Sequence, residues 1–291
     1  MAASPLGLPT RDALVSDAVA IGRGLGLIVD DPEVLKDSLN LLVWLRPSPV
    51  VARIQVRTGL VRSPDAAADS LALARFLTDA GLPVSPPADD IDAGPHVGAT
   101  GRSMTLWRRL EINDEPPDPA AAGRSLRQLH EAMAAFDGPL RHVGPIAEVG
   151  RLIDLLDAHG RDEARRLGEL SSRIVLPELP VQALHGDAHL NNVVTASDGI
   201  RWMDWEESWR GPIAWDLACL DHRRRTFGDR SDEIGRAIRA YGQYDRDAAD
   251  AWSPVVALWA AAWGLLGEAD GLDWGTDARR RLAWVERRLP G

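Results

Sequence analysis

Apolar residues recur at two spacings along this chain, and the change from one spacing to the other divides it into two parts. In residues 11–26 and 66–80 they recur every three or four positions, which is typical of one buried helix face. Residues 41–45, 50–57 and 104–107 are short apolar runs that predict strands, and the proline-rich stretch between the first two predicts a hairpin turn. The N-terminal part therefore predicts a small sheet with two helices.

After an acidic, proline-rich segment at 113–119, which predicts a loop, the pattern becomes almost entirely helical. Helical spacing resumes at 126–136. Further helical segments are predicted at residues 146–175, 230–245, 248–268 and 276–288. Strands first and helices afterwards predict an α+β fold with a sheet-rich lobe over residues 1–107 and a helical lobe over 108–291.

The composition fits a chain of two lobes, since 291 residues can bury a sizeable core. A single cysteine, Cys219, excludes an internal disulfide and suits a reducing compartment. The N-terminus lacks the basic start and apolar core of a signal peptide, and we find no run of about 18 apolar residues that would span a membrane. We therefore expect a cytoplasmic protein, monomeric or homodimeric, with no membrane partner.

The net charge of −10 argues against nucleic acid as a partner, because phosphate backbones require a basic surface. An acidic excess could favour a cationic substrate, but it is also what an ordinary solvated surface carries. The charge thus excludes one class of partner without choosing a substrate.

The most specific pattern is a set of polar residues in the second half of the chain. Asp187 is followed five residues later by Asn192 and twelve residues after that by Asp204, which ends a short apolar run. Phosphoryl transfer requires such a set, because one carboxylate orients a hydroxyl and accepts its proton while an amide and a second carboxylate hold Mg²⁺. The order Asp, Asn, Asp is that of the kinase catalytic and metal-binding loops.

These motifs resemble those of the aminoglycoside phosphotransferase and choline kinase-like family, which shares the protein-kinase fold. The shared signature is His-Gly-Asp at 185–187 with Asn192 and Asp204, followed by a Gly-Pro-x-x-x-Asp-Leu-Ala stretch at 211–218. The resemblance implies a bilobal kinase-like fold and a small-molecule O-phosphotransferase that uses ATP or GTP with Mg²⁺. Its acceptor would be a hydroxyl of an amino sugar, an amino alcohol or a related metabolite or antibiotic, with a cationic acceptor among the options.

The resemblance also implies roles for individual residues of the helical lobe. Asp187 would be the catalytic residue. Asn192 and Asp204 would be Mg²⁺ ligands, and the family spacing favours Asn192 over its neighbour Asn191.

Other polar residues near these motifs have expected positions as well. Asp216 is expected to accept backbone N–H groups of the catalytic loop, and His185 and His189 are expected to pack that loop rather than to transfer protons. Glu206 could reach the metal or a cationic acceptor, whereas Glu207 is expected to be exposed.

The small lobe is expected to bind the nucleotide. Kinases use a strand lysine for the α- and β-phosphates, and Arg53 occupies that place in this sequence. An arginine keeps a fixed charge and can bind phosphate oxygens with two hydrogen bonds. The glutamate that usually pairs with the lysine has no evident counterpart on the next helix, where Asp69 and Ser70 are the nearest candidates.

A glycine-rich phosphate loop of the kinase type does not precede the first predicted strand. The phosphate cover is instead expected at residues 36–40, where Ser38 and Asn40 offer short polar groups. The hinge is expected at residues 106–110, with the backbone groups of the segment meeting the nucleobase. Its candidate nucleotide contacts are Leu106, Trp107 and Arg108.

The acceptor site is less defined, although eleven tryptophans are unusual for this length. Trp205, Trp209 and Trp215 lie near the catalytic motifs. Trp259 and Trp263 are four residues apart on one predicted helix, where aromatic side chains belong either to a core or to a site for a cation. These residues do not select one acceptor.

Two other functions stay open. His185, Asp187 and His189 alternate along the chain and would share one face of a strand, as zinc ligands of a metal-dependent hydrolase could. The replaced lysine and the missing glutamate would also suit a catalytically weak, pseudokinase-like scaffold that binds nucleotide.

Overall fold

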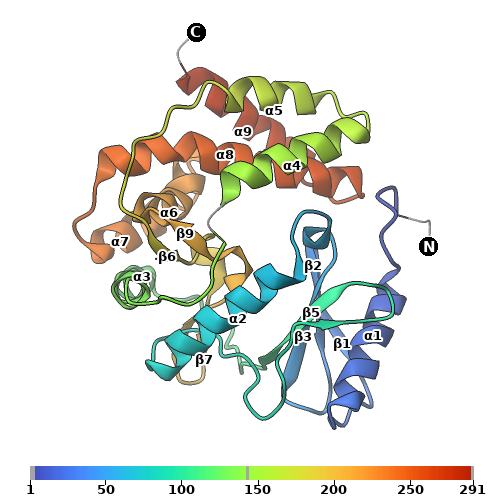
Figure 1. Ribbon diagram of the computed structural model, residues 1–291. Helices are drawn as coiled ribbons and strands as arrows, with labels where there is room; N and C mark the ends of the chain where they lie inside the picture. The colour runs from blue at the N-terminus through green and yellow to red at the C-terminus, as the bar shows by residue number, and fades with distance from the viewer. Residues whose placement is uncertain (1–3, 142–143, 290–291) are drawn as a thin grey trace.

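The computed structural model of the protein describes residues 4–141 and 144–289. It has the predicted α+β architecture, with a sheet between two helices in the N-terminal lobe and mainly helices in the C-terminal lobe (Figure 1). The N-terminal elements are α1 (Arg11–Gly24), β1 (Glu33–Asp37), β2 (Asn40–Trp44), β3 (Val50–Gln55), the 3₁₀ turn η1 (Thr58–Leu60), α2 (Pro64–Asp79), β4 (His96–Val97) and β5 (Ser103–Arg108).

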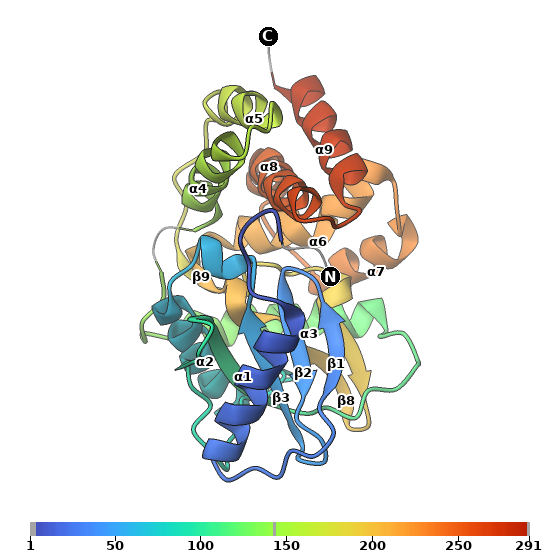
Figure 2. The same cartoon turned by 90° about the vertical axis from the view of Figure 1, so that its right-hand side faces the viewer.

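The sheet of the small lobe has the strand order β1-β2-β3-β5-β4, and every neighbouring pair is antiparallel. Side chains alternate between the two faces of a strand. Ala52 and Ile54 of β3 are fully buried in a core that includes Leu14 and Ala18 of α1, which lies across the strands in Figure 2. Arg53, between them, is therefore directed to the opposite face, toward the C-terminal lobe.

The C-terminal lobe contains two small sheets inserted among helices. Its helices are α3 (Pro119–Met133), α4 (Pro145–Ala158), α5 (Glu163–Ser171), α6 (Ile213–Phe227), α7 (Ser231–Tyr241), α8 (Arg246–Ala269) and α9 (Gly275–Arg288). Between α5 and α6 follow β6 (Gln182–Leu184), the 3₁₀ turn η2 (Leu190–Asn192), β7 (Val193–Ala196), β8 (Gly199–Trp202), the 3₁₀ turn η3 (Trp205–Glu207) and β9 (Trp209–Gly211). Because β6 pairs with β9 and β7 with β8, the two loops that carry the polar motifs lie side by side.

Most predicted elements lie within a few residues of their predicted positions. The strand β4 and the helix α6 are not among the predicted elements, and two further differences have a clear physical cause. The strand β1 is not predicted, because all five of its residues are exposed and it lies at the sheet edge, where no buried face imposes an apolar pattern. The segment 146–175 forms two helices rather than one. The chain turns at Gly160, whose φ of +64° favours glycine.

The helix α8 forms the centre of the large lobe. It packs against α4, α6 and α9 in both views of the molecule (Figures 1 and 2). By length and composition it could cross a membrane, which the sequence did not lead us to expect, but 83% of its apolar window is buried inside the protein. Such burial is typical of a core helix.

Buried ion pairs join the two lobes. Arg62, which precedes α2, binds Glu148 of α4 with an Nε–Oε1 distance of 2.6 Å and also donates to Glu207 of η3. Arg57 lies 2.5 Å from a carboxylate oxygen of Asp270, at the end of α8. Buried charges cost free energy unless they are paired, so these contacts favour one arrangement of the lobes. The prediction that Glu207 is exposed is wrong, because the network requires its burial.

Candidate active site

Asp216 of α6 supports the loop after β6 by hydrogen bonds to its backbone, as predicted. The two carboxylate oxygens accept the backbone N–H groups of His185 at 3.0 Å and Gly186 at 2.9 Å. Gly186 has a φ of +88°, and a Cβ there would lie 2.0 Å from the carbonyl oxygen of Glu207, so only glycine fits. The His185 imidazole bonds to the carbonyl of Met203 at 2.9 Å. These contacts fix the loop that presents the predicted catalytic carboxylate.

Asp187 contacts Asn192 and His189. The Asn192 amide nitrogen donates to the carbonyl oxygen of Asp187 at 2.9 Å and to its Oδ2 at 3.1 Å, and His189 Nε2 lies 3.3 Å from the same Oδ2. Burial acts to raise the pKa of Asp187, but the charge and hydrogen bond of His189 outweigh it and lower that pKa to about 2. The carboxylate is thus ionised at neutral pH. The sequence predicted only a packing role for His189, so its electrostatic contact with Asp187 is a difference from the prediction.

Asp204 has a left-handed backbone conformation, with φ of 63° and ψ of 53°. Conformations of this kind cost a non-glycine residue about 1–3 kcal/mol and cluster at functional sites, although Asp adopts them more readily than most residues. Asp204 follows the β7–β8 hairpin, and its carboxylate lines the same cavity as Asp187 and Asn192. The backbone strain is therefore a second indication, independent of the motif, that this position is functional.

Arg53 is ion-paired to the C-terminal lobe. Its Nη1 lies 2.5 Å from Asp204 Oδ1, and its Nη2 and Nε lie 2.5 and 3.1 Å from the two carboxylate oxygens of Glu206. Burial acts to lower the pKa of Arg53, but the two carboxylates raise it, so the guanidinium stays charged. Ser70 of α2 bonds to a carbonyl of its own helix instead. Glu206 is therefore the glutamate that pairs with Arg53, a contact that the sequence did not reveal.

The predicted phosphate cover forms the β1–β2 hairpin, whose residues Lys36, Ser38 and Asn40 line the cavity. Lys36 Nζ lies 3.9 Å from Asp204 Oδ2. The Asn40 amide nitrogen donates to both carboxylate oxygens of Glu206, at 2.5 and 2.7 Å. Asn40 therefore supports the partner of Arg53 and does not present a free amide to a phosphate. Ser38 stays a predicted phosphate contact.

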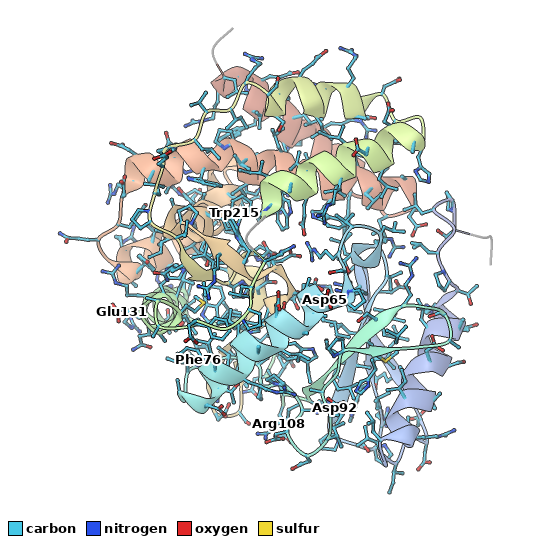
Figure 3. All side chains as sticks on the ribbon, viewed as in Figure 1. Asp65, Phe76, Asp92, Arg108, Glu131 and Trp215 are labelled. Atoms are coloured by element: carbon cyan, nitrogen blue, oxygen red, sulfur yellow. The ribbon has the colours of Figure 1, made fainter. Side chains whose placement is uncertain are left out.

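The predicted hinge residues belong to β5, which corrects their expected role. The backbone N–H of Leu106 bonds to the carbonyl of Ala93 at 2.9 Å, and its carbonyl accepts the N–H of Ala88 at 3.0 Å, so both groups are already paired. The side chain of Arg108, which is labelled in Figure 3, pairs with Asp89. Leu106 and Arg108 thus serve the sheet, and neither lines the cavity that contains Asp187.

Trp107 stays a predicted contact of the nucleobase, although it does not line the cavity that contains Asp187. It pairs with Val51 in the sheet, and Arg53 pairs with Thr105, so the alternation of β3 and β5 directs Trp107 and Arg53 to one face. The indole N–H of Trp107 donates to Thr105 Oγ1 at 2.8 Å, and the ring is partly buried. The chain then crosses to the C-terminal lobe through residues 109–118.

One cavity of about 490 Å³ connects these residues to the helices of the C-terminal lobe. We call its first part the loop half, which is lined by Lys36, Ser38, Asn40, Arg53, Asp187, His189, Asn192, Asp204 and Glu206. We call its second part the helix half, which is lined by residues of α6, α8, α9 and the α8–α9 connection, namely His222, Arg223, Trp259, Trp263, Asp273, Trp274, Asp277 and Arg281. Of the residues that line the helix half, only Trp259 and Trp263 were candidates from the sequence.

The structure divides the tryptophans between core and cavity, which the sequence left open. Trp205, Trp209 and Trp215 are core residues with at most 5% exposure, and Figure 3 shows Trp215 in the interior of the helical lobe. Trp259 and Trp263, although mostly buried, line the helix half. The residues nearest to the motifs in sequence are thus not the ones that face the cavity.

Asn192 and Asp204 fit a hard divalent cation such as Mg²⁺. Because its Nδ2 is bonded to Asp187, Asn192 keeps its Oδ1 as an oxygen ligand. Asp204 offers two carboxylate oxygens, whose charge Arg53 and Lys36 balance in this structure. Oxygen donors of this kind are the ligands that Mg²⁺ prefers.

The geometry disfavours two of the alternatives that the sequence left open. Asn191 also lines the cavity, but its side-chain oxygen accepts a hydrogen bond from Arg230, which supports Asn192 as the metal ligand. The imidazole of His185 is fully buried against Met203 and does not converge with Asp187 and His189. Within residues 4–141 and 144–289, we find no group of three His, Cys, Asp or Glu side chains arranged to hold a metal ion.

Comparison with protein families gives one match, and it covers most of the chain. The sequence model of the Phosphotransferase enzyme family matches residues 34–252. This range contains every residue that lines the loop half. No curated protein matches the sequence.

Several solved structures with a similar fold are kinases or phosphotransferases. A choline/ethanolamine kinase family protein from Mesorhizobium loti is 20% identical, with a TM-score of 0.60 over 92% of this chain and 93% of that one. A choline kinase from Streptococcus pneumoniae is 18% identical, with a TM-score of 0.65 over 92% of this chain and 98% of that one. A spectinomycin phosphotransferase in complex with ADP and spectinomycin is 12% identical, with a TM-score of 0.58 over 95% and 94%. At these identities the structures show a shared fold.

Proposed function

This chain belongs to the phosphotransferase enzyme family, and we propose that it transfers the γ-phosphoryl group of ATP or GTP to a hydroxyl of a small molecule that carries an amine. The observation that carries the proposal is the loop half of the cavity. There the ionised Asp187, the oxygen ligands Asn192 and Asp204, and the charged Arg53 line one space.

Asp187, Asn192 and Asp204 have distinct roles in the proposed reaction. Asp187 accepts a hydrogen bond from the acceptor hydroxyl, orients it for attack and takes its proton. Asn192 and Asp204 would hold Mg²⁺, which when bound would neutralise charge on the phosphates. Positioning and electrostatic stabilisation provide most of the acceleration in transfers of this kind.

Arg53 takes the part of the strand lysine in this proposal. When the nucleotide binds, its guanidinium leaves Asp204 for the phosphate oxygens and keeps Glu206 as its anchor. The exchange is possible because Arg53 has separate nitrogens for the two carboxylates. Ser38, at the tip of the hairpin, lies over the phosphates, and Trp107 borders the nucleobase.

The amine of the acceptor is proposed to lie in the helix half. The rings of Trp259, Trp263 and Trp274 and the carboxylates of Asp273 and Asp277 line this space. Aromatic faces and carboxylates together favour a cation. The proposal therefore selects amino sugars and amino alcohols over neutral acceptors.

Two measurements test the proposed function. Thermal unfolding with millimolar ATP or GTP, with and without Mg²⁺, should give a higher Tm with the Mg²⁺-nucleotide, because a ligand that binds only the native state stabilises it. A nucleotide-consumption screen against amines, amino sugars, macrolides and sugars should then identify the acceptor. No shift with either nucleotide contradicts the proposal, and binding without turnover of any acceptor favours the scaffold.

A further inference from the structure

A cluster of positive charge lies where α6 meets α9, at the edge of the helix half. Three arginines surround the ring of Phe227, with guanidinium carbons 5.2 Å (Arg223), 4.6 Å (Arg280) and 4.8 Å (Arg281) from its centroid. Arg223 and Arg280 are each paired with an aspartate. Two of the three charges are therefore compensated within the protein.

Arg281 is the exception, because within the described part of the chain it forms no salt bridge. Its one hydrogen bond runs from Nε to His222 Nε2, at 3.0 Å. Burial is the main cause that lowers the pKa of Arg281, to about 10, which still leaves the guanidinium charged at neutral pH. The charge of Asp277 acts to raise the pKa of Arg281, but in the described residues this carboxylate is ion-paired to Arg280 and forms no salt bridge with Arg281. A partly buried guanidinium without a paired carboxylate is costly, and such a group is often matched by a ligand.

His222 adds no charge and fixes the direction of the guanidinium. Burial, followed by the charge of Arg281, lowers the pKa of His222 to about 3, so the ring is neutral. Its Nε2 accepts the hydrogen bond from Arg281, and its Nδ1 lies 3.3 Å from Thr226 Oγ1. With Nε held in this way, Nη1 and Nη2 of Arg281 remain as donors for a ligand in the cavity.

This subsite shares the cavity with the loop half. His222 and Arg281 line the same space as Asp187 and Asn192. The charge of Asp187 also acts on the pKa of His222, which requires the two side chains to be near each other. A small molecule can therefore reach both Arg281 and Asp187.

We propose that Arg281 binds a carboxylate of the acceptor while the acceptor hydroxyl faces Asp187. A guanidinium donates two parallel hydrogen bonds to a carboxylate, a geometry that Lys cannot provide. The inference rests on the proposed function and narrows its acceptor to a hydroxyl compound that carries both an amine and an acidic group.

The test compares matched amino alcohols that differ only by a carboxylate. The probes are ethanolamine with L-serine, and 3-amino-1-propanol with L-homoserine. Their affinities are measured by calorimetry for wild-type protein, Arg281→Gln and Arg281→Lys, with and without Mg²⁺ and AMP-PNP. Arg280→Gln is the matched control, because Arg280 contacts the same ring but does not line the cavity.

We expect the wild-type protein to bind the carboxylated member of a pair at least about tenfold more tightly, as loss of a charge-assisted hydrogen bond predicts. Arg281→Gln should remove this preference, Arg281→Lys should keep part of it, and Arg280→Gln should keep all of it. Equal affinity within both pairs, including no binding of any probe, overturns the proposal. A preference that survives in Arg281→Gln overturns it too.

The measurements with AMP-PNP distinguish two anions that Arg281 could bind, namely the carboxylate of the acceptor and the phosphates of the donor. If Arg281→Gln weakens AMP-PNP binding in protein without an acceptor, Arg281 serves the donor phosphates and the assignment is wrong. Failure of the wild-type protein to bind nucleotide contradicts the proposed function instead. The carboxylate preference in nucleotide-free protein still decides the role of Arg281 in that case.

Discussion

The two halves of the cavity are built in different ways. The loop half draws most of its residues from two adjacent loops, which the β6–β9 and β7–β8 pairings bring together. The helix half is assembled from α6, α8, α9 and the connection between the last two. The matched family range, residues 34–252, includes the whole loop half but ends before Trp259 and Arg281.

This difference separates the chemistry of the protein from its recognition of an acceptor. The reacting groups lie within a short stretch and have few alternatives, because each has a fixed role toward phosphate, metal or hydroxyl. The acceptor contacts come from helix faces, where many side chains are compatible with the fold. We therefore expect substitutions in the loop half to affect turnover, and substitutions in the helix half to affect the choice of acceptor.

The largest effect is expected for Asp187→Asn, which keeps the shape of the side chain and removes its charge. Turnover should fall by roughly two to four orders of magnitude, the range typical of general acid–base assistance. Nucleotide affinity should be largely kept. Acceptor-dependent turnover and Mg²⁺-nucleotide affinity are measured on the same preparation, and wild-type turnover would remove Asp187 from the reaction.

Asp204→Asn should affect the loop half in a second way. It removes one charged oxygen ligand, so both turnover and Mg²⁺-dependent nucleotide binding should weaken. Titration of nucleotide at several Mg²⁺ concentrations measures this effect. Asn191→Ala is the matched control, because Asn191 lies next to a proposed ligand but bonds to Arg230. Equal losses in both variants would contradict the assignment of the metal site.

Arg53→Ala should weaken nucleotide binding and turnover together, by about tenfold or more, since a charge-assisted contact with phosphate is lost. Arg53→Lys should keep part of both, because the point charge remains while the planar fork is lost. Glu206→Gln should act in the same direction as Arg53→Ala but less strongly, because it removes only the anchor. Nucleotide titration distinguishes these cases, and wild-type affinity in Arg53→Ala would contradict the role.

The smallest effect concerns the pH dependence of the Asp187–His189 pair. The folded-state pKa of Asp187 is lowered to about 2, so its contribution to stability is present above its unfolded pKa and lost as pH falls toward 2. Asp187 raises the pKa of His189 against the effect of burial, so that contribution is present below about pH 6.5 and lost as pH rises through the raised value. His189→Gln should lower Tm by about 1–3 °C between about pH 4 and 6.5, and by less above that range. A Tm difference that grows with pH would contradict the pairing.

The sequence predicted most of the fold because apolar residues recur at helical or strand spacing in the buried elements. The local spacing of the motifs also predicted that Asp187, Asn192 and Asp204 lie together, as they do around one cavity, and that Asp216 supports the catalytic loop. Their roles in catalysis and metal binding stay predictions. The sequence did not predict the exposed edge strand β1, which has no buried face to impose a pattern.

Long-range contacts explain the remaining differences. Glu206 pairs with Arg53 across 153 positions, and Arg281 meets His222 across 59, so no local motif marks either contact. In the structure, residues 86–93 form hydrogen bonds with the backbone of β5. No local pattern shows these bonds, so the sequence predicted that the backbone of Leu106 would be free to contact a nucleobase. Trp205, Trp209 and Trp215 are close to the motifs in sequence, but their side chains pack into the core.

The central claim is that the loop half binds a Mg²⁺-nucleotide for transfer into the helix half. A crystal structure with Mg²⁺ and AMP-PNP tests it most directly. We predict that Mg²⁺ is bound by Asn192 and Asp204, that Arg53 moves from Asp204 to the phosphates while it stays bound to Glu206, and that the γ-phosphate faces Asp187. A nucleotide bound elsewhere, or an Arg53 that remains on Asp204 with no metal between Asn192 and Asp204, would contradict the account.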